Sequence, residues 1–307
     1  MSVRFEGRVA IVTGAGGGLG RQHALALAAR GAKVVVNDLG GAVDGPGGAA
    51  SAAEKVAQEI RAAGGEAIAD RASVTDFAAV EAMVAQAMAT WGRIDILVNN
   101  AGILRDKSFA KMELEDFRAV LDVHLMGAVH CTKAVWEIMR AQQYGRIVMT
   151  TSSSGLYGNF GQSNYGAAKM ALVGLMQTLA LEGAKHNIRV NCVAPTAATR
   201  MTETIFNEEL LALFAPEAVT PGVLALASED APSRAILAAG AGGFERAYVT
   251  LTQGVFIPPS EDAAEQVMAK FAAISDRSDE LVPESGSEQG QVEMTKATPG
   301  GAGRAQS

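Results

Sequence analysis

Residues 8–40 read RVAIVTGAGGGLGRQHALALAARGAKVVVNDLG, and this stretch decides the fold. An apolar run at residues 9–13 leads into a glycine-rich turn, and a segment of helical period follows at residues 21–30. A second apolar run, residues 33–37, ends at Asp38. A strand, a glycine turn, a helix and a second strand in this order predict a βαβ unit.

Further apolar runs repeat this arrangement at residues 94–99, 146–151, 188–193 and 234–239, with segments of helical period between them. The runs are apolar at successive positions rather than at every second one, which is typical of parallel strands covered on both faces. The sequence therefore predicts an α/β fold, a single Rossmann-like doubly wound parallel sheet with helices on both faces. The length of the chain alone is also compatible with two small domains.

Composition narrows the class of protein. Hydrophobic residues make up 49% of the chain and aromatic residues only 5%, a mix that argues against an all-β sandwich. The formal net charge of -7 argues against a nucleic-acid binder and favours a small-molecule partner. Cys131 and Cys192 form no CxxC pair, and the four histidines show no metal-ligand spacing, so no metal is expected.

The sequence also carries expectations about location and domains. Arg4, Glu6 and Arg8 interrupt any signal-peptide core, and we expect no membrane-spanning stretch. The last residues, Ala-Gln-Ser, lack the SKL peroxisomal address, so we expect a cytoplasmic protein. The main domain is expected over residues 1–258. A C-terminal extension at 259–307 should hold one short helix, residues 261–273, and then a disordered tail.

Two features mark a dinucleotide site. The turn Thr13–Gly20 precedes a helix whose free N–H groups attract an anion, and Asp38 at the second strand's end can accept hydrogen bonds from ribose hydroxyls. Because Asp38 would repel a 2′-phosphate and Gly17 offers no cation, NAD is favoured over NADP. Alone, the turn is equally compatible with a purely structural loop. The glycine-rich residues 40–48 are either a flexible connection or a border of the adenosine site.

A second group of residues points to proton transfer. Tyr165 and Lys169 stand at i and i+4 on one helix, where the ammonium can lower the pKa of the phenol. Ser152 lies at the end of the fifth strand and can hold a substrate oxygen against Tyr165. Which serine of the cluster 152–154 points inward stays open.

Together these segments resemble the short-chain dehydrogenase/reductase family over roughly residues 5–255. The resemblance rests on TGAGGGLG, Asp38, NNAG at 99–102, Ser152, YGAAK at 165–169 and the segment at Pro195. It implies Tyr165 as acid/base, Lys169 as its electrostatic partner and ribose ligand, and Ser152 as the group that polarises the carbonyl. The cofactor-binding residues it implies are Gly14, Gly18, Leu19, Gly20, Asp38, Val74, Asn100, Ala101, Gly102, Tyr165, Lys169, Pro195 and Ala198.

A narrower similarity is to the (3R)-hydroxyacyl-CoA dehydrogenase branch of that family. It rests on VVVNDLGG (34–41), NNAGILRDKSF (99–109), YGRIVMTTSSSGLYGNFGQSNYGAAK (144–169) and APTAATRMTET (194–204). It implies a 3-hydroxyacyl-CoA substrate in fatty acid metabolism, a free-standing enzyme, and a homo-oligomer built on residues 117–140 and 163–185. Arg105, Lys107 and Lys111 are candidates for the CoA phosphates or a solvated face, and residues 195–214 are a candidate lid.

The alternatives are a dehydrogenase of steroids or other bulky alcohols and a nucleotide-binding regulator without turnover. Three positions depart from the family pattern. His124 stands where most members carry Asn, so it either keeps the helix bend and its relay water or leaves the relay to another group. Ser73 replaces a common Asp beside Val74, and Thr196 replaces a common Gly after Pro195.

Overall fold

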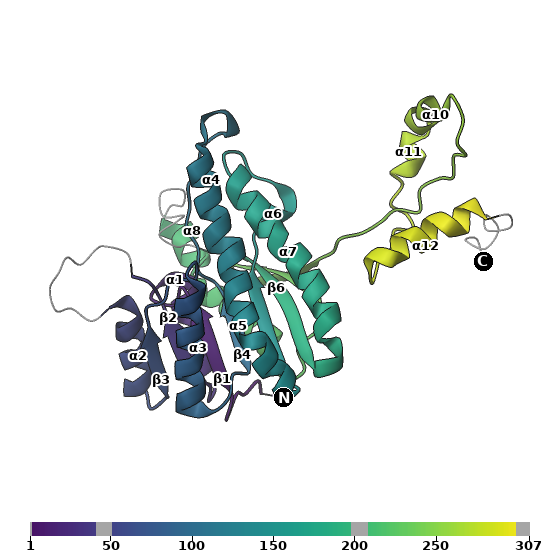
Figure 1. Cartoon of the computed structure of the whole chain (residues 1–307). Helices are drawn as coiled ribbons and strands as arrows, with labels where there is room; N and C mark the ends of the chain where they lie inside the picture. Colours follow the sequence, from purple (N-terminus) through teal and green to yellow (C-terminus); the bar gives the residue numbers. More distant parts are fainter. Residues whose placement is uncertain (1, 41–50, 198–207, 299–307) are drawn as a thin grey trace. The chain divides into compact units, whose positions relative to one another are not determined.

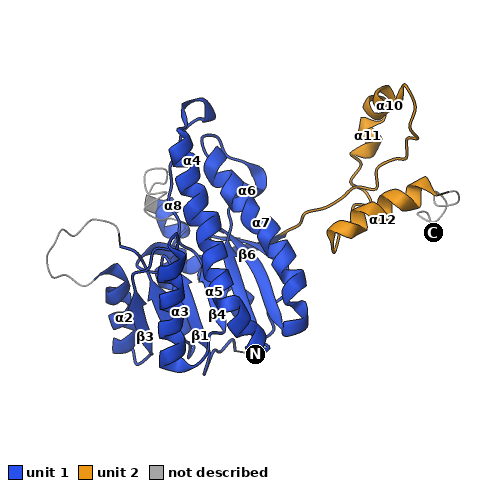
Figure 2. Ribbon diagram, in the orientation of Figure 1, with its two compact units in different colours: residues 1–246 blue, residues 247–307 orange. Residues whose placement is uncertain are grey.

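The structure is a computed structural model that describes residues 2–40, 51–197 and 208–298. The chain divides into two compact units, Met1–Arg246 and Ala247–Ser307 (Figure 2). The glycine-rich residues 41–48, Ala198 and half of the candidate lid lie outside the described residues.

Unit 1 is built on one sheet of eight strands in the order β3-β2-β1-β4-β5-β6-β7-β8. The strands are β1 (Val9–Thr13), β2 (Lys33–Asn37), β3 (Ala67–Asp70), β4 (Ile96–Asn99), β5 (Gly145–Thr150), β6 (Ile188–Thr196), β7 (Ile236–Gly240) and β8 (Gly243–Ala247). Neighbours from β3 to β7 pair in parallel. Only two residues join β7 to β8, a connection that suits an antiparallel neighbour. The predicted doubly wound sheet is confirmed, with the edge strands β3 and β8 added to it.

Helices cover both faces of this sheet (Figure 1). One face carries α1 (Gly18–Ala28), α2 (Ala52–Ala62) and α9 (Thr220–Ala227), whose buried residues form a core with the strands. The other carries α3 (Phe77–Trp91), α5 (Gly127–Gln142) and α7 (Ser163–Gly183). Unit 1 also contains shorter elements, namely η1 (Phe109–Lys111), α4 (Leu114–Leu121), α6 (Ser153–Tyr157), η3 (Ala184–His186), α8 (Glu208–Leu213) and η4 (Pro216–Ala218).

The long helix expected at 117–140 is interrupted. Between α4 and α5 the chain forms a π-helical turn, Asp122–Met126, which contains His124. A π-turn widens the helix locally and is frequent at functional sites. The edge strand β3 escaped prediction because only Ala67 of its four residues is buried, so it lacks the apolar signature of the central strands.

One stretch of unit 1, Glu209–Ala227, is long and apolar enough to cross a membrane by length and composition. No apolar stretch of membrane-spanning length was expected from the sequence. In the structure it is divided into α8, η4 and α9. Val223, Leu224 and Leu226 of α9 belong to the core beneath the sheet. The apolar character of α9 is therefore explained by packing inside unit 1.

Unit 2 contains α10 (Ala263–Ala269), α11 (Phe271–Ile274), α12 (Gly286–Ala297) and a bridge between Leu251 and Leu281. Its compact boundary precedes the domain boundary expected at 258. Helix α12 lies where the sequence predicted a tail without regular structure. None of the described residues at 275–298 is buried, which is why apolar periodicity gave no signal in that segment.

Candidate active site

The predicted site residues gather at the carboxyl ends of β1, β2, β4 and β5. Strands β1 and β4 are neighbours, and from them the sheet order runs outward in opposite directions. Open α/β sheets bind ligands in the crevice at such a switch point. The fold therefore places the glycine turn and the serine–tyrosine–lysine group at one edge of the sheet.

The glycine turn packs tightly against the end of β4. Gly14 and Gly18 have φ angles of 62° and 52°, in the region that favours glycine. A Cβ atom at Gly14 would lie 2.9 Å from the Cα of Ala101, and one at Gly20 would collide with the Gly14 carbonyl. Helix α1 has no side-chain cap at Gly17 and no acidic residue in its first turn. Its N–H groups can therefore hold an anion.

Asp38 is tied to this turn. One carboxylate oxygen, Oδ2, accepts the Gly16 N–H at 2.8 Å, and Oδ1 accepts the Gly40 N–H at 2.9 Å. A side chain at Gly16 would come within 2.8 Å of the carboxylate, so glycine is required there. Asp38 is only half-buried and keeps lone pairs for further donors.

The end of β4 braces the turn through Asn100. Its Nδ2 donates to the carbonyl oxygens of Thr13 and Gly14 at 3.0 and 3.1 Å. The Thr13 hydroxyl in turn accepts the N–H groups of Asn100 and Ala101. The structure thus brings Asn100 and Ala101 to the glycine turn.

Ser152 is the serine that faces inward. It caps α6, is buried, and its Oγ accepts the Ser154 N–H at 3.1 Å. Burial raises the pKa of Tyr165, the hydrogen bond with Ser152 opposes that rise, and the negative charge of Asp106 adds to it. Ser153, in contrast, is exposed.

Lys169 lies beneath Tyr165. Its Nζ is 5.3 Å from the centre of the Tyr165 ring and donates to the Thr150 carbonyl at 2.6 Å. Burial lowers the pKa of Lys169 to about 7, with the Cys192 thiol opposing this. The sequence predicted a lowered Tyr165 pKa, whereas the structure shows it raised. Burial of the phenol is the largest cause, and the ammonium that was expected to lower the pKa donates instead to the Thr150 carbonyl.

His124 completes the group from the π-helical turn. Its Nε2 lies 2.8 Å from the Ile103 carbonyl oxygen, and its ring meets that of Tyr165 edge-on at 5.1 Å. Burial, then the positive charge of Lys169, lower its pKa to about 3, while the bond to Ile103 opposes this. Its buried Nδ1 has no partner among the described residues. A side chain at Gly102 would collide with the His124 ring.

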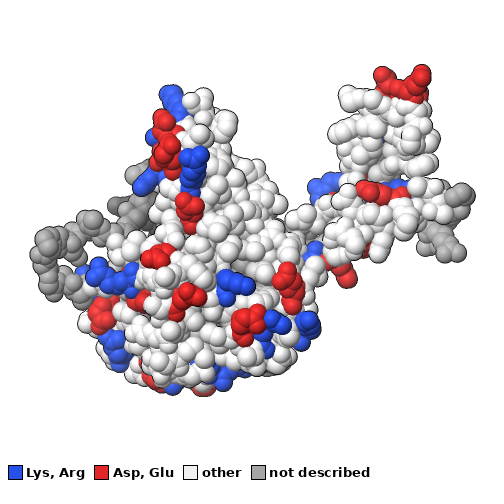
Figure 3. All heavy atoms as spheres, viewed as in Figure 1, with Lys and Arg blue, Asp and Glu red and all other residues white. Residues whose placement is uncertain are grey.

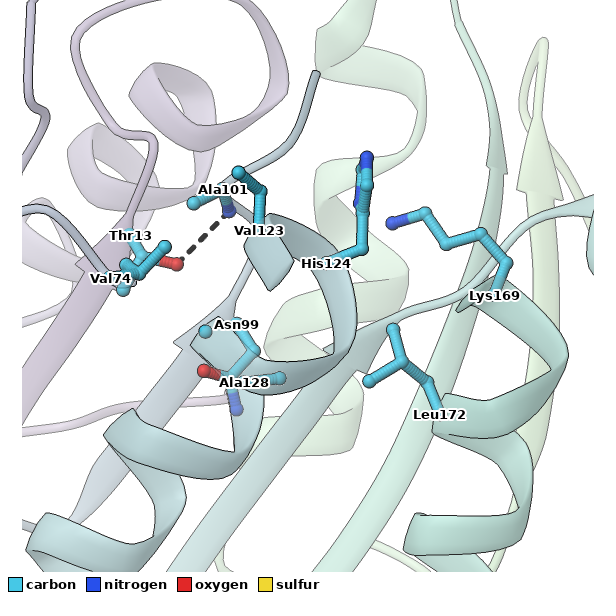
Figure 4. Close-up of a pocket in the computed structure, with 10 residues that line it drawn as sticks. Thr13, Val74, Asn99, Ala101, Val123, His124, Ala128, Lys169 and Leu172 are labelled. Atoms are coloured by element: carbon cyan, nitrogen blue, oxygen red, sulfur yellow. Dashed lines mark hydrogen bonds between the residues drawn. The ribbon is translucent and has the colours of Figure 1, made fainter. Parts of the chain in front are cut away.

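A cavity of about 10 Å³ lies between these groups (Figure 4). His124, Lys169, Asn99, Thr13 and Val74 are among its lining residues. Its size is about that of one water molecule, and its polar walls offer hydrogen-bond partners. The bend at His124 and a space beside Lys169 are thus both present.

Other predicted residues stand farther from this group. Pro195 lies in β6 and is half-buried. Arg105 and Lys107, candidates for the CoA phosphates, both face Asp116, at 3.6 and 3.1 Å. Part of their charge is therefore balanced within the protein.

Sequence reasoning missed a set of polar residues around Tyr165. Gln162 and Asn164 flank the start of α7, and each contacts the loop after β4 at Asp106 or Arg105. Only the position of Asn164 next to Tyr165 could have drawn attention to it. The partners are more than fifty residues away in sequence, beyond the reach of local patterns.

With this geometry in place, the class of protein follows. Residues 8–210 match the model of the short chain dehydrogenase family, and the chain belongs to that family. It is therefore an oxidoreductase.

Three known proteins show where in the family the chain lies. The peroxisomal hydratase-dehydrogenase-epimerase of Saccharomyces cerevisiae is 48% identical over 281 residues, 91% of this chain and 31% of the yeast protein. The full-length peroxisomal multifunctional enzyme type 2 of Drosophila melanogaster superposes with a TM-score of 0.79 at 40% identity, covering 95% of this chain and 49% of that one. A 7α-hydroxysteroid dehydrogenase, solved with NADH and a 7-oxo bile acid, gives 0.69 at 31% identity over 78% of this chain and 95% of its own.

The expectation of a cytoplasmic location was wrong. The yeast and fly proteins, to which nine-tenths of the chain is similar, are both peroxisomal by name. The expectation rested on a missing C-terminal tripeptide. Such an address is read by a receptor and leaves no trace in the fold.

Proposed function

We propose that the chain interconverts a 3-hydroxyacyl-CoA and its 3-ketone with NAD(H). The observation that carries this proposal is the meeting of Ser152, Tyr165 and Lys169 beside a glycine turn closed by Asp38. A regulator without turnover would have no need of a buried ammonium beneath a buried phenol, because burial of each charged form is costly.

The residues present fit a nicotinamide dinucleotide. The uncapped N-terminus of α1 suits the pyrophosphate, and Gly14 and Gly20 let the turn pack closely against the end of β4. The Asp38 carboxylate suits two ribose hydroxyls and disfavours a 2′-phosphate, which supports NAD(H). The similar hydroxysteroid dehydrogenase was solved with NADH. We assign the adenine side to Val74 and the nicotinamide side to Asn100, Ala101, Gly102, Lys169, Pro195 and Ala198.

When bound, the nicotinamide supplies or accepts the hydride. The protein handles the proton. In reduction, the Ser152 hydroxyl donates to the substrate carbonyl oxygen, and the Tyr165 phenol gives that oxygen its proton. The raised pKa of Tyr165 keeps the phenol protonated until then. In oxidation the same groups act in reverse, and the Lys169 ammonium stabilises the phenolate.

The neutral His124 suits a relay role. Nε2 lies 2.8 Å from the Ile103 carbonyl oxygen and 3.1 Å from the Ile103 nitrogen, and in the tautomer that carries Nε2–H the Nδ1 atom is an acceptor without a partner among the described residues. The cavity beside Lys169 offers room for about one water that connects the two side chains. We therefore propose that His124 keeps the helix bend and the water site rather than leaving the relay to another group.

The substrate class is supported by the relatives. A hydratase adds water to a double bond and creates a hydroxyl group, which a dehydrogenase then oxidises; the yeast relative names both activities in one chain. The chain spans less than half of each of the two multifunctional relatives, so it corresponds to one part of them. The steroid alternative has the support of a more distant structure.

We further propose a homo-oligomer that uses the outer face of α7. Between Ser163 and Leu181 the only charged residue is Lys169, which is buried. Met170 and Leu181 are 41% and 52% exposed. Figure 3 shows a surface largely free of charged side chains over α6 and α7. Light scattering that finds a monomer at all working concentrations would exclude this assembly.

The decisive experiment follows the change in nicotinamide absorbance with acetoacetyl-CoA. We expect turnover with NADH to exceed turnover with NADPH by more than tenfold, because Asp38 repels the 2′-phosphate. The matching ketone without CoA is the control and should react poorly. Equal rates for the ketone with and without CoA would favour the bulky-alcohol alternative, and NADPH preference would contradict the role of Asp38.

A further inference from the structure

Gln162 links three segments of the site. It is the N-cap residue of α7, yet its side chain makes no capping bond to that helix. Its Nε2 donates to Asp106 Oδ2 at 2.7 Å, and its Oε1 accepts the Ser154 hydroxyl at 2.8 Å and Asn159 Nδ2 at 3.0 Å. Both ends of the amide are engaged, so its orientation is fixed.

The same bonds continue to the reacting groups. The backbone N–H of Ser154 donates to Ser152 Oγ at 3.1 Å, and Ser152 lies close enough to the Tyr165 hydroxyl to lower the pKa of that phenol. The result is one chain of contacts, Asp106 to Gln162 to Ser154 to Ser152 to Tyr165. Asp106, at the far end, is exposed and lies in the loop after β4. The position of this loop therefore influences where the Ser152 hydroxyl is held.

The loop itself is attached on both sides of Asp106. The Arg105 carbonyl accepts Asn164 Nδ2 at 3.0 Å, and Asn164 is completely buried beside Tyr165. The Lys107 N–H donates to the Gly161 carbonyl at 2.9 Å. With its backbone held in this way, Asp106 is a fixed acceptor rather than a mobile surface carboxylate.

We propose that Gln162 and Asp106 are positioning residues, whose hydrogen bond holds Ser154, and through it Ser152, in register with the Tyr165 hydroxyl. The inference rests on the proposed proton transfer by Tyr165 but not on CoA as part of the substrate. Neither side chain is assigned a contact with the substrate. Their effect belongs in kcat, since a misplaced hydroxyl slows proton transfer without weakening cofactor binding.

The first test is Gln162→Glu. The new carboxylate still accepts from Ser154 but faces the Asp106 carboxylate where a donor stood. We expect kcat to fall about tenfold at pH 8 with unchanged NADH affinity, and to recover as the pH falls toward 5, because a protonated glutamate donates to Asp106 again. The other ionisable groups facing Tyr165 are Lys169 and His124, and they remain in both proteins, so the ratio of the two pH profiles isolates the new pair.

The second test reverses the polarity of the bond. In the double variant Asp106→Asn, Gln162→Glu, the asparagine amide donates to the glutamate carboxylate, and we expect kcat to return to within about threefold of the wild type. The matched control is Gln289→Glu, since Gln289 also donates to a carboxylate, that of Glu293 at 2.9 Å, in unit 2. Its kcat should not change.

Ser154→Ala provides an independent measurement. It removes the hydroxyl that donates to Gln162 and keeps the N–H that donates to Ser152, and we expect a several-fold lower kcat. Wild-type kcat in both Gln162→Glu and Ser154→Ala, or a double variant as slow as the single one at full NADH affinity, would overturn the proposal. All variants are assayed with whichever ketone the wild type reduces, so failure of the CoA assignment leaves this test intact.

Discussion

Buried polar groups have opposite surroundings at the two ends of the strands. We call the side of the sheet where the strands begin its amino edge and the side where they end its carboxyl edge. At the amino edge, Asp95 is fully buried and accepts Arg8 Nη1 at 3.0 Å, Arg93 Nε at 2.7 Å and the Val9 N–H at 2.9 Å. Arg146, also fully buried, donates to four backbone carbonyls. Between Arg8 and Arg146 lies the Tyr144 ring, 3.6 and 4.2 Å from the two guanidinium carbons.

At the carboxyl edge, polar groups are buried without such partners. Among the described residues, four buried side-chain atoms have no hydrogen-bond partner, and three of them belong to Asn99, His124 and Thr150 at this edge. The Lys169 ammonium donates to one carbonyl, that of Thr150. An unpaired buried polar group costs free energy, whereas a saturated one does not. The amino edge is thus built for stability, and the carboxyl edge keeps groups ready for ligands at a cost in stability.

The largest expected effect separates the edges by activity. Tyr165→Phe removes the proton donor, and we expect kcat to fall about 10³-fold while NADH affinity and the melting temperature stay near wild type. The same change at the amino edge, Tyr144→Phe, is the control. It keeps the ring between the two guanidinium groups, so activity should stay within about twofold. Residual activity above a tenth of wild type in Tyr165→Phe would remove Tyr165 from its role.

The second effect separates the edges by stability. Asp95→Asn leaves two guanidinium groups facing a neutral amide, and we expect the free energy of unfolding to fall by about 3 kcal/mol, with wild-type kcat for the folded fraction. Denaturant titration measures the first quantity. Asp38→Asn, at the carboxyl edge, should instead weaken NADH binding and change the unfolding free energy little. If the two variants exchanged these outcomes, the assignment of roles to the edges would be wrong.

The features that could be predicted from the sequence are those that depend on neighbouring residues. The features that could not be predicted depend on residues far apart in the chain. The bounds of β1 and β2, the glycine turn and the spacing of Tyr165 and Lys169 are all encoded within a few neighbouring residues. In contrast, Arg8 donates a hydrogen bond to Glu229, which is 221 positions away in the sequence, and Gln162 donates to Asp106, which is 56 positions away. Such pairs depend on the order of the strands, and no periodicity in the chain reveals them.

The last effect concerns the pH dependence of stability. Burial lowers the pKa of Lys169 to about 7 in the folded protein, from 10.5 in the unfolded chain. Between these values the unfolded chain binds a proton that the folded protein does not, so this group makes the free energy of unfolding rise with pH from about 7 to 10.5. In Lys169→Met the rise should disappear, and stability at pH 7 should not decrease, because no buried ammonium has to be accommodated. The exposed Lys133 serves as control, since Lys133→Met should leave the pH profile unchanged. A Lys169→Met protein that loses stability at neutral pH would show that the bond to Thr150 outweighs the cost of burial, and the contrast between the two edges would then hold for His124 and Asn99 but not for Lys169.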